Sequence, residues 1–230
     1  MSVRRTLPWR PLGAARLGGS DGVEVVGNVN VNATATSVTA SAVNVQPGDV
    51  LFITTWGQVS PSVTTAATVS DGSTVSLIHA EILHFTTSVR TEWARITTAG
   101  SITVTGNASA SGTLYLHVLV LRGVSPGDPV LVGQTDLEMV SVSSTTMVLP
   151  AYTLDDPGIA IALVACGDNN AMTFSSPWTE AYEQWHGTTR AMAVAYEVLN
   201  APGDTTELTV TMGAADPLVG RRLALRGPGR

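Results

Sequence analysis

The sequence predicts an all-β fold made of two tandem antiparallel units of β-sandwich or jelly-roll type, preceded by an extended N-terminal arm. The first observation is a repeat: residues 45–56 and 154–165 each contain a Pro-Gly turn followed by an apolar strand, and residues 121–123 and 225–227 each end a later strand in Leu-Arg-Gly. The two turns lie 110 residues apart and the two closing glycines 104 apart. The second observation is a series of short strand-like segments with turns every ~8–12 residues, as in sandwiches and barrels.

The repeat also sets the expected boundaries. We expect an extended arm over residues 1–22, a first β unit over 23–128 and a second β unit over 129–230. The two units form either two compact domains or one packed body, since a chain of 230 residues is long enough for both arrangements.

The arm cannot form a helix because Pro8 and Pro11 interrupt it, and its glycines loosen the rest. Four arginines and a tryptophan precede the first acidic residue, Asp21. Arginine pairs with carboxylates through two parallel hydrogen bonds, and tryptophan is a frequent interface anchor. The arm is therefore either a free tail or a segment that binds a partner subunit. The residues expected to contact such a partner are Arg4, Arg5, Trp9, Arg10 and Arg16.

Hydrophobic periodicity places the strands of the first unit. They are expected at residues 23–31, 34–45, 50–56, 63–69, 74–82, 87–97, 101–105 and 114–121. The nearly continuous apolar run at 50–56 is typical of a strand buried on both faces, so Leu51 and Ile53 are predicted core residues. Asp71-Gly72 predicts a hairpin, and the segment GNASASG at 106–112 predicts a turn.

The second unit repeats the pattern after a connector at 129–145, which we expect to pair near residues 130–132. Its strands are expected at 144–149, 159–164, 172–174, 178–185, 190–199, 207–212 and 218–225. Ile161 and Leu163 are its predicted core residues, and no helix is expected in either unit.

Composition narrows the classes of function. Charged residues make up 13% of the chain against a usual ~25%, and all 12 basic residues are arginines. A net charge of −6 argues against a nucleic-acid-binding protein. No run of ~18 apolar residues predicts a membrane span, and the N-terminal residues lack the apolar region of a signal peptide. A neutral surface rich in Ser, Thr and Asn suits a subunit of a larger assembly.

Several short motifs resemble β-sandwich proteins of tailed-phage and prophage virions. They are QPGD at 46–49 with the apolar strand after it, SSPW at 175–178, AMAVAYEV at 191–198, APGD at 201–204 and LALRG at 223–227. The likeness covers roughly residues 40–227. The first unit departs from the family pattern, because Trp93 stands where a tyrosine is usual and no Pro-Trp turn precedes it.

The resemblance implies a structural virion protein: a capsid decoration protein, a head spike or a fibre component. Its partners would be other capsid or tail subunits and further copies of itself, without nucleic acid or membrane. Its location would be the virion, assembled in the host cytoplasm. The alternative is a carbohydrate-binding adhesin or tail-fibre module that recognises a host-surface glycan.

Residue patterns do not indicate catalysis, and no cofactor or metal site is expected. His79 and His84 are five residues apart, so on one strand they point to opposite faces. His117 lies inside an apolar strand, as packed histidines do, and no histidine has the spacing of a metal ligand set. The chain lacks a nucleophile elbow and the glycine motifs that bind phosphates or dinucleotides.

We interpret the paired carboxylates and the single cysteine as structural residues without a catalytic or metal-binding role. Glu180 and Glu183 are three apart and would point to opposite faces of a strand, unlike a glycosidase pair. Asp155-Asp156 and the DNN segment at 168–170 are interpreted as solvated turns. Cys166 ends an apolar strand and is interpreted as a buried small hydrophobe.

Trp178, Tyr182 and Trp185 are the candidate glycan-binding aromatics. On a regular strand Trp178 and Tyr182 share one face and Trp185 takes the other. We expect the shared face to pack in the core and Trp185 to cap a loop. The alternative is a surface at Tyr182 and Trp185 on which a sugar ring stacks.

Overall fold

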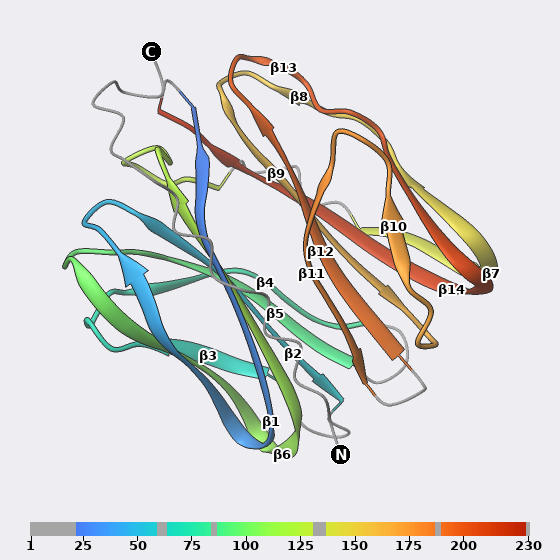
Figure 1. Cartoon of the computed structure of the whole chain (residues 1–230), viewed down its shortest axis with the longest axis horizontal. Coiled ribbons are helices and arrows are strands. Elements are labelled where there is room, and N and C mark those ends of the chain that lie inside the picture. Colours follow the sequence, from blue (N-terminus) through green and yellow to red (C-terminus); the bar gives the residue numbers. More distant parts are fainter. Residues whose placement is uncertain (1–21, 59–63, 84–86, 131–136, 187–189, 229–230) are drawn as a thin grey trace.

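The computed structural model describes residues 22–58, 64–83, 87–130, 137–186 and 190–228. Within these residues the protein is all-β and has no helix, as the sequence predicts. The two halves of the chain, residues 23–128 and 129–230, each supply one six-stranded antiparallel sheet, and Figure 1 shows the two sheets side by side. The predicted arm lies outside the described residues except for Gly22.

Each half has its own set of strands. The first half contains β1 (Glu24–Val45), β2 (Val50–Gln58), β3 (Thr64–Val69), β4 (Val75–Leu83), β5 (Thr87–Arg95) and β6 (Gly100–Arg122). The second half contains β7 (Leu137–Leu149), β8 (Thr153–Leu154), β9 (Gly158–Cys166), β10 (Met172–Phe174), β11 (Thr179–His186), β12 (Arg190–Leu199), β13 (Gly203–Asp204) and β14 (Leu208–Arg226). Strands β8 and β13 form a separate two-stranded sheet.

The two large sheets have the same strand order. In the first, β1, β6, β2, β5 and β4 lie side by side, and β3 also pairs with β6. In the second, β7, β14, β9, β12 and β11 lie side by side, and β10 also pairs with β14. Each strand of the first half therefore has a counterpart in the second, so the repeated sequence motifs mark a repeated topology.

Three strands are longer than the sequence predicts. The segments expected at 23–31 and 34–45 form the single strand β1, those at 101–105 and 114–121 merge into β6, and those at 207–212 and 218–225 merge into β14. The turn predicted at 106–112 is therefore wrong. Register shifts, between Ala35 and Ser37 in β1 and between Thr211 and Asp216 in β14, mark where the strands bend while pairing continues beyond the bend.

The predicted hairpin at Asp71-Gly72 is also wrong. A tight turn is present, with Gly72 at a φ of 79° and the Ser73 N–H donating to Asp71 Oδ1 at 2.9 Å. However, β3 pairs with β6 and β4 pairs with β5, so the strands on either side of the turn do not pair with each other. In the connector, Val130 forms an isolated bridge with Leu225, which agrees with the pairing expected there.

Bending lets each half enclose a core of its own, and the two sheets enclose a third core between them. The first-half cluster includes Val38, Ala40, Leu51, Ile53, Ala67, Ile102, Val104, Leu116 and Val118. The second-half cluster includes Met147, Leu149, Ala160, Ala162, Val164, Met172, Trp178, Leu208 and Val210. The shared cluster includes Val50, Phe52, Trp56, Tyr115, Leu119, Leu121, Ile159, Ile161, Leu163, Tyr182, Val194, Leu223 and Leu225.

Strands β2 and β9 take part in two cores at once. Leu51 and Ile53 face the first-half cluster, whereas Val50 and Phe52 face the shared cluster. The predicted core residues are confirmed, since Leu51, Ile53 and Ile161 are 0% exposed and Leu163 is 5% exposed.

An ion pair joins the Pro-Gly turn to the end of the last strand in each half. Arg122 donates from Nε to Oδ1 and from Nη2 to Oδ2 of Asp49, both at 2.9 Å. In the second half, Arg226 Nε lies 3.3 Å from Oδ2 of Asp156. The Asp49 side chain is 2% exposed and the Asp156 side chain is 35% exposed, so the carboxylate of the ion pair is buried in the first half and partly solvated in the second.

This difference gives a matched test. Arg122→Met should lower the free energy of unfolding by about 1–3 kcal/mol, because it removes both guanidinium donors from a buried carboxylate and leaves only the Gln46 N–H, which donates to Oδ2 at 2.9 Å. Arg226→Met should cost at most about 1 kcal/mol, because water solvates Asp156. Urea unfolding of both variants measures the two costs. Equal costs would show that burial of Asp49 does not strengthen the pair.

Candidate functional site

A group of aromatic and polar residues lies where the first sheet meets β11 of the second. The rings of Trp56 and Tyr115 stack with centroids 4.2 Å apart and planes 16° from parallel. Tyr115 donates its hydroxyl hydrogen to the Trp185 carbonyl at 3.3 Å. Burial raises the pKa of Tyr115 to about 12, so the phenol stays protonated at neutral pH. These contacts tie β2 and β6 to the end of β11.

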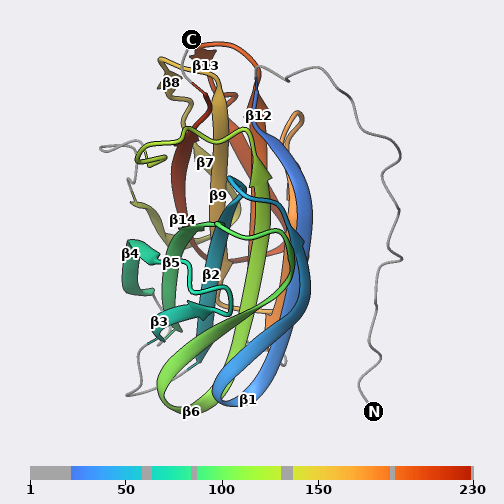
Figure 2. The ribbon, with the colours of Figure 1, turned by 90° about the vertical axis from the view of Figure 1, so that its left-hand side faces the viewer.

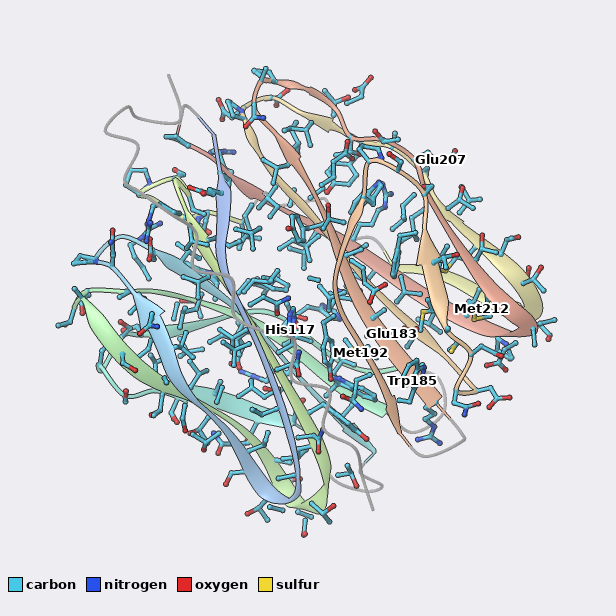
Figure 3. The ribbon with its side chains drawn as sticks, in the orientation of Figure 1. His117, Glu183, Trp185, Met192, Glu207 and Met212 are labelled. Atoms are coloured by element: carbon cyan, nitrogen blue, oxygen red, sulfur yellow. The ribbon has the colours of Figure 1, made fainter. Side chains whose placement is uncertain are left out.

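His117 is the centre of this group. Figure 3 shows it between the two halves, and its side chain is 0% exposed. Its ring stacks on Tyr182 of β11 with centroids 4.9 Å apart. Its Nε2 lies 2.8 Å from Oδ1 of Asn28 in β1, and the Asn28 amide donates to the Ala181 carbonyl. Since the Asn28 oxygen can only accept, Nε2 carries the proton and His117 is the donor.

This arrangement makes His117 a structural group. Burial lowers its pKa to about 3, so the imidazole is neutral at physiological pH. Its Nδ1 is buried and has no hydrogen-bond partner among the residues that the structure describes. A general base has to reach the proton that it removes, and this nitrogen is closed off from solvent. The sequence interpretation of His117 as a packed histidine agrees with its burial.

A bulge in β11 changes the faces predicted for the aromatic residues. Glu180 pairs with Ala195 and Tyr182 pairs with Val194, so Ala181 is the extra residue. Tyr182 therefore faces the shared cluster, whereas Trp178, just before the strand, packs in the second-half cluster. The prediction that Trp178 and Tyr182 share a face is wrong, because an extra residue reverses the alternation.

The same bulge brings the two glutamates together. Glu180 and Glu183 lie opposite Ala195 and Ala193, which both face the second-half cluster, so the two carboxylates share that face. The prediction of opposite faces is wrong for the same reason. Burial raises the pKa of Glu183, while the Met172 N–H, which donates to its Oε1 at 2.7 Å, lowers it and the charge of Glu180 raises it. Burial also raises the pKa of Glu180.

The candidate glycan residues are separated. Tyr182 is 4% exposed, so its ring cannot stack on a sugar in this conformation. Trp185 is 44% exposed and pairs with Ala191, which places it on the face of Glu180 and Glu183. Figure 3 shows Trp185 and Glu183 on the same strand. The groups that a ligand could contact here are therefore one indole ring and two carboxylates along β11.

The other candidate residues do not extend this site. Cys166 is 1% exposed and donates to the Asp168 carbonyl at 2.9 Å, and burial raises the pKa of its thiol. Among the described residues, no three His, Cys, Asp or Glu side chains are grouped as metal ligands. His84, the side chain of His186, and the arm residues Arg4, Arg5, Trp9, Arg10 and Arg16 lie outside the described residues.

Two structural residues carry no sequence signal. Asn28 links both sheets through its side chain, yet it sits among other asparagines in an alternating strand. Glu92 is 1% exposed, accepting from the Ala67 N–H at 2.9 Å and from Arg90 Nε at 2.7 Å. Both depend on contacts between strands that are distant in sequence.

Comparison with known proteins gives no relative: no family model, curated protein or solved structure matches this chain. In the part of the chain that the structure describes, no helix is long and apolar enough to cross a membrane.

The buried histidine predicts a pH dependence of stability. The unfolded chain binds a proton at His117 below about pH 6.5, whereas the folded state does so only near pH 3. The contribution of His117 to the free energy of unfolding is therefore complete above pH 6.5. It is lost as the pH falls toward 3, at about 1.4 kcal/mol per pH unit. Measurements of the free energy of unfolding at several pH values test this in the parent protein and in His117→Gln. The difference between the two should change steadily with pH across this range, and a constant difference would contradict the assignment.

Proposed function

We propose that the protein is a structural component of a phage-like particle, most simply a capsid decoration or head-spike protein held by subunit contacts and by its N-terminal arm. The observation that carries the proposal is the structural role of the motifs that resemble virion proteins. The Pro-Gly turn and the closing Leu-Arg-Gly lie beside each other in both halves, joined by the Asp49–Arg122 and Asp156–Arg226 pairs. The motifs thus form the framework of the fold, as expected if the resemblance is structural.

The packing agrees with this role. We propose that each half is a small β-sandwich, since its bent sheet encloses one core, and that the two halves act as one body through the shared cluster. Such a body resists deformation because its central strands are covered on both sides. It presents a surface of low charge, which suits close contact between protein subunits.

The arm is the part of the chain best suited to hold a neighbour. Its arginines stand ahead of a chain whose net charge is −6, so they can pair with acidic groups on a capsid subunit. Trp9 would supply the apolar anchor. The β halves would then be presented on the particle surface.

Removal of the arm tests the proposal. Deleting residues 1–20 should leave the circular dichroism spectrum all-β but weaken binding to particles that lack this protein by about tenfold or more. Co-sedimentation measures the binding, and added salt should weaken it partly because ion pairs are screened. A control that replaces Arg4, Arg5, Arg10 and Arg16 with Gln keeps the length and removes only the charge. Equal binding by the truncated and full chains would place the contact on the β halves.

A second candidate function is recognition of a host-surface glycan. The observation that favours it is the half-exposed ring of Trp185 on the same face as Glu180 and Glu183. An indole stacks on the apolar face of a sugar, and carboxylates accept hydrogen bonds from its hydroxyls. Tyr182 would support the site from within the core, without contacting the sugar.

A glycan array with the full chain tests this candidate. Trp185→Ala should abolish any specific signal, because it removes the stacking surface. Leu77→Ala is the matched control, since Leu77 is 52% exposed and lies on β4 of the other sheet. Binding that survives Trp185→Ala, or a parent protein that binds no glycan, would exclude recognition through this residue.

A further inference from the structure

Strand β1 forms one edge of the first sheet. Over residues 27–35 it pairs with β6 without a break in register, from Gly27 opposite Val120 to Ala35 opposite Gly112. Within the described residues, no strand pairs with its other side. Figure 2 shows β1 running along a margin of the body. No described strand uses the outer backbone N–H and C=O groups of this segment, which can therefore pair with a strand of another chain.

This edge lacks the features that normally prevent pairing. Proteins protect free edges with charges, prolines, bulges or short strands. Residues 27–35 read GNVNVNATA and contain no charge and no proline. By contrast, β4 has a bulge between Leu77 and His79, and β11 has both a bulge and the charges of Glu180 and Glu183. Strand β10 has only three residues.

Its counterpart in the repeat differs in charge. Strand β7 corresponds to β1, and both strands pair irregularly at the bend, between Ala35 and Ser37 in β1 and between Thr211 and Asp216 opposite β7. The sequence of β7 includes Glu138, whereas residues 27–35 of β1 contain no charged residue. The two halves share a topology, so the uncharged edge segment of β1 is not a requirement of the fold. It is a property of the first half alone.

The side chains of the segment make it complementary to itself. Asn30, Asn32 and Thr34 are exposed on one face. Val29, Val31 and Ala33 alternate with them and are only half-buried against the first-half cluster. A strand with the same alternation would place amides and hydroxyls opposite one another and would cover the half-exposed apolar rim.

We propose that residues 27–35 pair antiparallel with the same segment of a second copy of this chain, so that the two first sheets form one continuous sheet. A two-fold axis perpendicular to the sheet keeps the faces matched, with Asn and Thr on one side and Val and Ala on the other. Each chain carries a net charge of −6, but the segment is neutral, so the contact itself brings no like charges together. The contact rests on this strand edge and is independent of attachment to a particle.

Added charge at the edge tests the contact. Analytical ultracentrifugation of the full chain should show a dimer at micromolar concentrations. Asn30→Lys with Asn32→Lys should raise its dissociation constant about tenfold or more, because like charges then face each other across the axis. The control is Ser101→Lys with Thr103→Lys, which adds the same charge at exposed positions of β6 and should leave the dimer intact. A parent chain that stays monomeric, or a dimer unaffected by Asn30→Lys with Asn32→Lys, overturns the proposal.

A cysteine scan locates the axis independently. In a two-fold antiparallel pair one residue lies opposite itself, with Cα atoms ~4.5–5.5 Å apart, a separation that a disulfide can span. Single cysteines at positions 29 to 33 should therefore cross-link most efficiently at one position, and Cys166 does not compete because it is 1% exposed. Cross-linking that is absent at all five positions, or equal at all of them, overturns the pairing.

Discussion

The structure depends on two strands, β2 and β9, that are buried on both faces. A fully buried aliphatic or aromatic side chain adds about 1.5–3 kcal/mol to the free energy of unfolding, but only where other side chains pack over it. Phe52 and Ile161 obtain cover from the opposite sheet, whereas Ile53 and Val164 obtain it from the bent part of their own half. Because both faces of both strands have to be covered, the protein needs one core between the two sheets and one further core in each half. The long bent strands β1, β6 and β14 enclose the two further cores.

Close packing against the long strands β6 and β14 restricts which residues can occupy some of their positions. A Cβ on Gly106, in β6, would lie 2.6 Å from Thr55 Oγ1 of β2. A Cβ on Gly220, in β14, would lie 2.5 Å from Met147 Cε of β7. Each half thus uses a glycine on its long strand to bring a neighbour into contact. The glycine at 106 therefore allows β6 to approach Thr55 closely, although the sequence pattern predicted a turn there.

The distribution of polar groups bears on function. His117, Tyr115 and Tyr182 are held between the sheets, where burial shifts the pKa of each toward the neutral form. These residues fix one sheet against the other and do not face solvent. Among the described residues, the uncharged edge of β1 and the half-exposed Trp185 on β11 lie at the outer surface. The proposed strand pairing depends on the first feature and the proposed glycan recognition on the second.

The sequence by itself determined the all-β class, the position of most strands, the repeat and the core residues Leu51, Ile53, Ile161 and Leu163. These follow from local alternation and apolar runs, which report whether a residue is buried. Tertiary structure alone decided where strands end and which faces they present. The bulge at Ala181 moved Glu183 beside Glu180 and separated Trp178 from Tyr182, because one extra residue inverts every later side chain. The merging of predicted strands into β6, and the link from Asn28 to His117 and Ala181, likewise depend on partners distant in sequence.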